Sequence, residues 1–302
     1  MRVHGPLPIR VLTHNIRYAT QSPFKGEEKW DVRRPRLINE LHFNTSQCAE
    51  SFICLQEVLH QQLIDILSDL NSKRKTWDHV GVGRDDGRQA GEYSPILYRP
   101  GVWELSVQKT VWLSKTPDRP SKSWDAASTR ILTIAVFQHR ETRKTVVTMN
   151  THLDDQGSKS RLEAAKIILE QIRLFTDQTP YRKIHPVFLA GDFNSEPEQE
   201  AYNEMTSEHS PMIDLQTMVP ESHRYGDFNT FSGFDPQTTR RKRIDFIFVN
   251  KDDPSDSKKG REDDDTAERW WIVDWYAVLP NRFEDGIYNS DHQAVIGDIS
   301  VI

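Results

Sequence analysis

Short apolar runs rich in β-branched and aromatic residues recur along the whole chain, and this pattern predicts β-strands. Val187–Ala190 is typical, because it is an uninterrupted apolar run bounded by Pro186 and Gly191. The predicted strands are Ile9–Asn15, Phe52–Gln56, His79–Val82, Pro95–Tyr98, Trp103–Leu113, Arg130–Gln138, Thr145–Thr151, Val187–Ala190, Ile244–Val249, Trp270–Tyr276 and Ala294–Ile299.

Other stretches show the spacing of an amphipathic helix. The clearest are Val32–Phe43, Leu59–Leu70 and Ser158–Phe175, and Glu198–Ser207 is a shorter candidate. Early strands alternate with these helices, whereas the middle of the chain is a series of strands. This mixture predicts an α/β fold in which two sheets pack together and helices cover the outside.

The length of 302 residues allows one large α/β domain or two small ones. No internal repeat and no Gly/Ser-rich linker divides the sequence. Lys251–Arg269 alternates acidic and basic clusters and predicts a solvated loop between two strands.

Composition limits the classes of protein to consider. Charged residues make up 28% of the chain and hydrophobic residues 36%, which is typical of a soluble protein. No stretch approaches the roughly 20 apolar residues that a membrane span needs, and the first ten residues carry no apolar signal segment. Cys48 and Cys54 are too few for a disulfide framework and indicate free thiols in a reducing compartment. We therefore expect an intracellular, cytoplasmic monomer without a membrane span. The net charge of −6 counts mildly against a protein that binds duplex DNA.

The tetrapeptide Gly191-Asp192-Phe193-Asn194 follows the apolar run Pro186–Ala190. Residues two apart on an extended chain face the same side, so Asp192 and Asn194 are expected to converge on one point. A carboxylate beside an amide suits a hard cation, a phosphate, or both. A simple turn at the end of the strand is the alternative interpretation.

Six predicted strands contain such a polar residue or lie directly beside one in the sequence. This repetition favours a functional site over a simple turn. The residues are Asn15, Glu57, His152, Asp192 with Asn194, Asp245, and Asp291 with His292. Carboxylate and amide oxygens are the ligands that Mg²⁺ and Mn²⁺ prefer, and thiolate zinc sites look different. The two histidines can exchange protons with water or phosphate near neutral pH.

In this order the motifs resemble the endonuclease/exonuclease/phosphatase superfamily. The motifs are Asn15, Leu55-Gln56-Glu57, Asn150-Thr151-His152-Leu153, Gly191–Asn194, Arg243-Ile244-Asp245 and Ser290-Asp291-His292. Trp30 with Arg33, the run Gly91–Arg99 and the run Thr230–Phe234 resemble the deadenylase-like branch and its compact microbial relatives. The resemblance covers Ile9 to Ile302. It implies a four-layer α/β/β/α sandwich, with residues 1–302 as one domain and the site at one rim of the paired sheets.

The resemblance also implies a role for each residue. Glu57, Asn15 and Asp291 would bind Mg²⁺ or Mn²⁺, while Asp192 and Asn194 would position the attacking water and the phosphate. His292 would be the general base or a phosphate contact and would be oriented by Asp245. His152, held by Glu92, would stabilise charge on the phosphate oxygens, and Arg33 would also touch a phosphate.

Three of these residues have other interpretations that the sequence leaves open. Asp245 could instead be a buried strand residue paired with Arg130 or Arg243. Glu92 could be an ordinary surface acid, and Arg33 could be a surface residue at the start of a helix.

The implied activity is metal-assisted, in-line attack of water on a phosphoester, most of all on a phosphodiester. A 3′–5′ exonuclease acting on RNA or single-stranded DNA is the first interpretation. The alternatives are an inositol or lipid phosphatase and a broad small-molecule phosphodiesterase. A non-catalytic binding protein is a remote alternative, because Glu57, Asp192 and His292 are all present.

Overall fold

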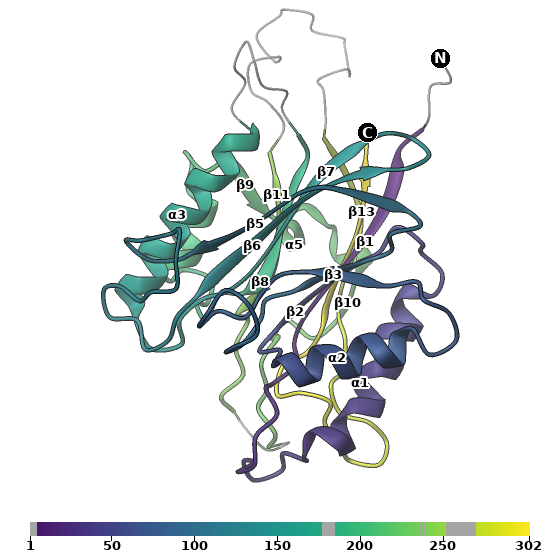
Figure 1. The fold of residues 1–302 in the computed structure, drawn as a ribbon, viewed down its shortest axis with the longest axis vertical. Helices are drawn as coiled ribbons and strands as arrows, with labels where there is room; N and C mark the ends of the chain where they lie inside the picture. The colour runs from purple at the N-terminus through teal and green to yellow at the C-terminus, as the bar shows by residue number, and fades with distance from the viewer. Residues whose placement is uncertain (1–4, 177–184, 236, 238, 252–269) are drawn as a thin grey trace, which may run out of the picture.

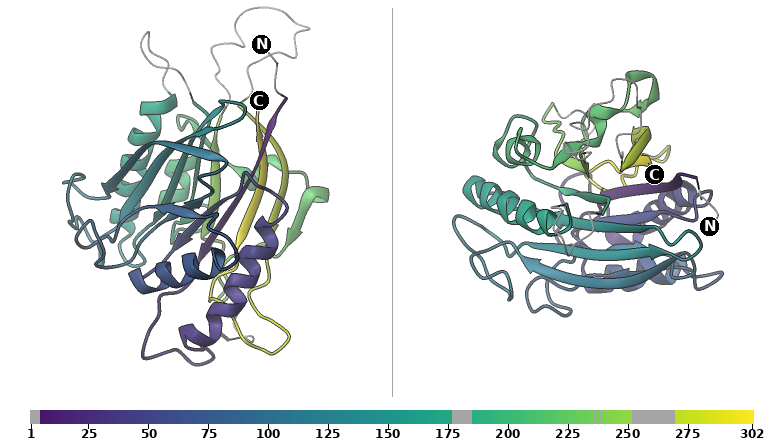
Figure 2. Two further views of the ribbon diagram at one scale, coloured as in Figure 1. Left: turned by 45° about the vertical axis from the view of Figure 1, so that its right-hand side comes forward. Right: turned by 90° about the horizontal axis from the view of Figure 1, so that it is seen from above.

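Two mixed β-sheets pack face to face in the computed structural model, with helices on both outer faces (Figure 1). The structure describes residues 5–176, 185–235, 237, 239–251 and 270–302. The loop predicted at Lys251–Arg269 lies outside this part of the chain, except for Lys251. The fold is therefore the α/β sandwich that the sequence predicts, and Figure 2 shows its layers from two further sides.

The first sheet has the strand order β10-β12-β13-β1-β2-β4-β3. Its central strand β1 pairs in parallel with β2 and antiparallel with β13. The strands are β1 (Leu7–Asn15), β2 (Phe52–Gln56), β3 (Asp78–Val80), β4 (Ile96–Tyr98), β10 (Arg224–Gly226), β12 (Trp271–Val278) and β13 (Val295–Val301).

The second sheet has the strand order β5-β6-β7-β8-β11-β9. Within it, β7 and β8 are parallel, while β8 and β11 are antiparallel. The strands are β5 (Trp103–Trp112), β6 (Ile131–His139), β7 (Thr145–His152), β8 (Val187–Asp192), β9 (Met212–Asp214) and β11 (Asp245–Asn250).

Alternation along each strand divides the apolar residues between three layers. On β1, Val11 points into the core between the sheets, whereas Leu12 packs into the cluster under the helices. The central core contains a group of aromatic rings, with Phe52 within 5.6 Å of the ring centroids of Trp103, Phe137 and Phe188. This core fixes how the two sheets lie against each other.

Two pairs of helices cover the sandwich. The helices α1 (Trp30–Thr45) and α2 (His60–Leu70) pack on the first sheet, and α3 (Ser158–Thr176) and α4 (Glu200–Thr206) pack on the second. Their bounds agree with the predicted helices to within a few residues. The sequence did not predict the short elements β9, β10, α5 (Leu215–Met218) and η1 (Glu221–His223). No helix in the described part of the chain is long and apolar enough to cross a membrane.

Candidate active site

The register of the second sheet places three predicted site residues in one row. His152 ends β7 and Asp192 ends β8, and the two are paired directly across these parallel strands. Asp245 begins β11 and is paired with Asp192 on the other side. Side chains in paired positions lie on the same face of a sheet, so the row brings three functional groups to one edge.

Asp245 and His292 form a hydrogen-bonded pair. His292 Nδ1 lies 2.9 Å from Asp245 Oδ2, and both side chains are buried. Thr230 Oγ1 accepts hydrogen bonds from the backbone N–H groups of Ile244 and Asp245, and its own hydroxyl donates to Asp245 Oδ2 at 2.6 Å. Burial lowers the pKa of His292, but the carboxylates of Asp245 and Asp192 more than offset it and raise the pKa to about 10. His292 is therefore a cation at neutral pH.

Asp192 lies at the centre of the site. Its Oδ1 accepts the backbone N–H of Asn194 at 2.8 Å, and its Oδ2 accepts from Asn15 Nδ2 at 3.0 Å. The same Oδ2 lies 3.7 Å from His292 Nε2 and 3.5 Å from His152 Nε2. Burial and the charge of Asp245 raise the pKa of Asp192. This carboxylate therefore has a raised proton affinity and faces both imidazoles.

His152 carries no charge in this environment. Burial and the positive charge of Arg130 lower the pKa of His152 to about 3. Its Nε2 is 3.1 Å from Asn194 Nδ2, an amide donor, so Nε2 is the unprotonated nitrogen and Nδ1 carries the hydrogen. Glu92 Oε2 lies 3.7 Å from that Nδ1 and is held in turn by Arg84 at 2.8 Å. In this tautomer Nε2 has no hydrogen to donate to a phosphate oxygen, so charge stabilisation by His152 stays a prediction.

The first sheet contributes a second group of oxygen atoms. Asn15 Nδ2 donates to Glu57 Oε1 at 3.1 Å as well as to Asp192, so one amide joins the edges of the two sheets. Glu57 Oε2 accepts the backbone N–H of Tyr18 and lies 3.8 Å from Arg17. Burial raises the pKa of Asp291, and the charge of Glu57 raises it further. A buried carboxylate with a raised pKa, close to a second carboxylate, favours a nearby cation.

The donor set fits a metal ion in two ways. Asp192, Asp245 and His292 each offer a ligand atom within 4.8 Å of the other two, and all three residues are buried. Glu57 and Asp291 supply two further carboxylates on the side of the first sheet. Hard oxygen ligands of this kind bind Mg²⁺ or Mn²⁺. Asn15 turns its amide nitrogen toward the carboxylates, so it acts here as a hydrogen-bond donor.

Backbone conformation at the site is specialised. Arg17, Glu57 and Asn194 have φ values of 57°, 58° and 46°, a region that is costly for residues with a Cβ atom. Residues held in such conformations concentrate at functional sites. The turn at Asn194 also differs from the extended chain that the spacing predicts. The side chains of Asp192 and Asn194 nevertheless both reach His152.

Gly191 precedes this turn and has a structural reason to be glycine. Its φ is 150°, and a Cβ atom there would lie 2.1 Å from the carbonyl oxygen of Thr151. Only glycine lets β8 lie this close to β7 immediately before Asp192.

The structure contradicts the predicted phosphate contact of Arg33. Its side chain is fully buried, and it donates to the carbonyl oxygens of Glu28, Ile16, Arg17 and Asn289. A guanidinium group committed to four backbone carbonyls cannot also bind substrate, so the predicted phosphate contact is wrong. The alternative of a surface residue is wrong as well.

The other two open alternatives also have structural answers. Arg243 pairs with Asp214 and Arg130 with Asp154 and Asp155, so neither arginine pairs with Asp245. Glu92 is half-buried and paired with Arg84, so it is not an ordinary surface acid.

Sequence reasoning missed three residues that support the site. Thr230 aligns Asp245, Arg84 holds Glu92, and Arg17 lies beside Glu57. Arg17 follows Asn15 by two residues, and this spacing could have indicated that Arg17 lies near the site. Thr230 and Arg84 lie in loops, and no periodicity connects them to their partners.

Comparison with known proteins agrees with the geometry. The sequence model described as the endonuclease/exonuclease/phosphatase family matches residues 12–264. A solved structure of an endonuclease/exonuclease/phosphatase family protein from Bacteroides thetaiotaomicron is 27% identical, with a TM-score of 0.81, and the match covers 99% of this chain and 100% of that one. A mannosyl-6-phosphatase from Bacteroides thetaiotaomicron is 28% identical, with a TM-score of 0.78, and the match covers 96% and 99% of the two chains.

The catalytic domain of human nocturnin is similar in fold alone. It is 18% identical, with a TM-score of 0.68, and the match covers 98% of this chain and 95% of that domain. Comparison with curated protein sequences gives no match.

Proposed function

Because the chain belongs to the endonuclease/exonuclease/phosphatase family, we propose that it hydrolyses a phosphoester with the help of Mg²⁺ or Mn²⁺. The observation that supports this most is the position of Asp192 Oδ2, which faces His292 Nε2 at 3.7 Å and His152 Nε2 at 3.5 Å. A proton acceptor thus lies between two imidazoles at a site rich in oxygen ligands.

We assign the proton transfer to Asp192. Its raised pKa makes it a better base than an exposed carboxylate, while its hydrogen bonds from Asn15 and Asn194 fix its orientation. A water molecule held by Asp192 would be positioned for in-line attack on phosphorus. Positioning of this kind can supply a large part of the rate enhancement.

His292 then acts as a phosphate contact, which is one of the two roles that the sequence allows. Its raised pKa keeps the imidazole protonated, and Asp245 fixes the ring through Nδ1. The Nε2–H group is left to donate to a phosphate oxygen as negative charge develops there. Asn194 and neutral His152 complete this wall of the site.

Glu57 and Asp291, with Asn15 beside them, are the residues we assign to the metal. A bound divalent cation would neutralise charge on the phosphate and on the leaving oxygen. The three groups Asp192, Asp245 and His292 are a second candidate set, which would need His292 in its unprotonated form.

The proposal includes two classes of substrate. The sequence predicts a phosphodiester, with single-stranded nucleic acid as the first example. A phosphomonoester of a sugar is the second candidate, because the mannosyl-6-phosphatase matches nearly the full length of this chain. The net charge of −6 also weakens the case for a polynucleotide.

Hydrolysis of bis-p-nitrophenyl phosphate and p-nitrophenyl phosphate tests the reaction class. We expect release of nitrophenol with Mg²⁺ or Mn²⁺, loss of activity in EDTA, and a large loss in His292→Ala. Equal rates in EDTA and with metal would refute the proposal. Oligo(A) and mannose 6-phosphate, assayed side by side, then distinguish the diester from the monoester.

A further inference from the structure

The segment Asn289–His292 carries two site residues, and it lies in a loop before β13. Contacts from other elements must therefore hold it in place. Ser290 Oγ donates to the carbonyl oxygen of Asn15 at 2.6 Å, and Asn281 Nδ2 donates to the carbonyl oxygen of Ser290 at 2.9 Å. Ser290 thus attaches the segment to the end of β1, and Asn281 attaches it to the loop that follows β12.

A second set of contacts comes from α1. Arg33 Nη1 donates to the carbonyl oxygen of Asn289 at 2.6 Å, and Glu40 Oε2 accepts from Asn289 Nδ2 at 3.0 Å. Glu40 lies two helical turns after Arg33, so both reach the same side of the loop from one face of the helix. The helix α1 therefore holds the residue at the start of the catalytic segment.

His14 connects this attachment directly to His292. Its ring is fully buried, with Nδ1 at 2.9 Å from Glu40 Oε1 and Nε2 at 3.2 Å from the carbonyl oxygen of His292. A carbonyl oxygen can only accept, so Nε2 carries a hydrogen. The other ring nitrogen, Nδ1, faces the Glu40 carboxyl group, so the two side chains fix the orientation of the ring from both ends.

We propose that His14 and Glu40 are positioning residues that set the location of the His292 backbone, and through it the imidazole between Asp245 and Asp192. The expected effect on the rate rests on the proposed function. The positioning of the His292 backbone does not depend on it. The chain of contacts runs from α1 through β1 to the loop. Neither His14 nor Glu40 has been assigned to water, phosphate or metal.

The distances at His292 explain why small displacements matter. Its Nδ1 to Asp245 Oδ2 distance is 2.9 Å, and its Nε2 to Asp192 Oδ2 distance is 3.7 Å. Both carboxylates are on the second sheet, whereas the carbonyl of His292 is held from the first. A backbone shift of about 1 Å can lower a rate about 100-fold, even when it originates away from the reacting atoms.

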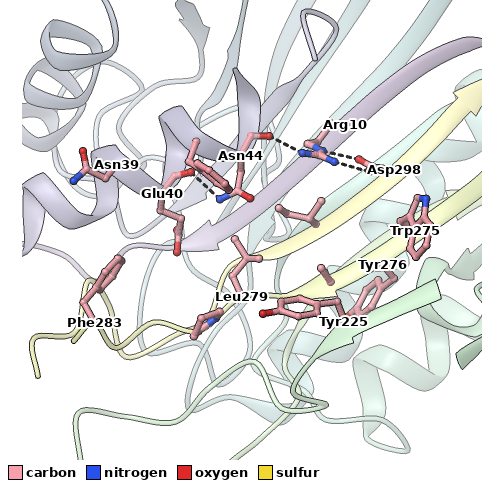
Figure 3. Close-up of a pocket in the computed structure, with 14 residues that line it drawn as sticks. Arg10, Asn39, Glu40, Asn44, Tyr225, Trp275, Tyr276, Leu279, Phe283 and Asp298 are labelled. Carbon is pink, nitrogen blue, oxygen red and sulfur yellow. Dashed lines mark hydrogen bonds and ion pairs between the residues drawn. The ribbon is translucent and has the colours of Figure 1, made fainter. Parts of the chain in front are cut away.

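The same strands offer a matched control. Arg10 and Asp298 are paired across β1 and β13, and Arg10 lies on the same face of β1 as His14. Arg10, Asp298 and Glu40 all line a groove of about 830 Å³, and Figure 3 shows the ion pair and Glu40 there. Arg10→Gln therefore removes an ion pair from the same strand, together with the hydrogen bond from Arg10 to the carbonyl oxygen of Asn44 in α1, and it leaves the contacts of Glu40, His14 and the catalytic loop in place.

The test compares Glu40→Gln with the double variant His14→Phe/Glu40→Gln. In the single variant the new side-chain amide can donate to His14 Nδ1 and accept from Asn289, so the connection is kept with no charge. The double variant keeps an aromatic ring but loses the hydrogen bond to His292, and it leaves no buried carboxylate. Kinetics with bis-p-nitrophenyl phosphate are measured together with ¹⁵N-histidine NMR in EDTA.

We expect Glu40→Gln and Arg10→Gln to keep kcat within about threefold of the wild type. The double variant should lower kcat by about 10- to 100-fold with KM little changed, and it should shift the His292 ring resonances. If the double variant does not fold, His14→Gln takes its place, with the same direction and a smaller effect.

The proposal is overturned if the folded His14 variant keeps wild-type kcat and His292 resonances, or if kcat falls only in proportion to the melting temperature across all variants. A wild-type protein without metal-dependent hydrolysis would refute the proposed function instead. The NMR comparison would still decide the positioning role in that case.

Discussion

Asp245→Asn is the most informative single substitution, because it removes the charge beside His292 while nearly keeping the shape. Asp245 Oδ2 accepts from both His292 Nδ1 and the Thr230 hydroxyl, whereas Oδ1 is buried without a hydrogen-bond partner. In the variant, the amide oxygen can keep the Oδ2 contacts, and the amide nitrogen takes the position that has no partner. The substitution therefore removes chiefly the charge–charge interaction between Asp245 and His292.

The magnitude follows from the pKa of His292, which is about 10 instead of 6.5. Each pKa unit corresponds to about 1.36 kcal/mol, so the protonated ring stabilises the fold by about 5 kcal/mol at most. Because the pKa is raised on folding, this stabilisation is complete below pH 6.5 and is lost as the pH rises through about 10. With about 2.1 cal/mol/K of unfolding entropy per residue, 5 kcal/mol corresponds to about 8 °C in melting temperature.

Thermal unfolding between pH 6.5 and 10 in EDTA measures this effect. We expect the melting temperature of the wild type to fall more steeply than that of Asp245→Asn, so that the two curves approach each other at high pH. Asp298→Asn is the control, because its carboxylate pairs with Arg10. A constant difference between wild type and Asp245→Asn across this range would refute the electrostatic account of His292. The same variant should lose about 100-fold in kcat, as when a preorganised donor is removed.

Three further predictions address stability, backbone and metal. Arg243→Met leaves Asp214 buried without its partner, so calorimetry should show a loss of about 3–5 kcal/mol, and a loss below 1 kcal/mol would contradict it. Gly191→Ala should lower both the melting temperature and kcat, because its Cβ would lie 2.1 Å from the Thr151 carbonyl oxygen; unchanged values would contradict the close approach of β7 and β8. Mg²⁺ at 100 times its Kd should stabilise the wild type by about 2.7 kcal/mol in scanning fluorimetry, and an equal gain in Glu57→Gln would argue against Glu57 as a ligand.

The regular part of the fold was predictable because it follows from periodicity. The long strands and α1 to α4 each bury a continuous apolar face, so their patterns are clear in the sequence. By contrast, β9, β10, α5 and η1 each comprise three or four residues. Elements that short show too few repeats for a clear periodicity. The strands β3 and β4 are equally short, and they were predicted only because each belongs to a longer run, His79–Val82 and Pro95–Tyr98.

Residue types and positions at strand ends were enough to predict the members of the site, but not their electrostatic states. His152 and His292 look equivalent in the sequence, yet their pKa values move in opposite directions, to about 3 and about 10. The difference comes from neighbours that are remote along the chain. Arg130 lies near His152, whereas Asp245 contacts His292. Arg33 shows the same limit, since four backbone carbonyls that determine its role come from three separate segments.

The site depends on the relation between the two sheets, because neither sheet holds a complete set of groups. The second sheet supplies His152, Asp192 and Asp245, and the first supplies Asn15 with Glu57 just beyond β2. Asn15 Nδ2 donates to one carboxylate on each side, at 3.1 Å and 3.0 Å. A shift of one sheet against the other would break one of these hydrogen bonds and move Asp192 away from Glu57. The aromatic core around Phe52 resists such a shift, so it contributes to the geometry of the site as well as to stability.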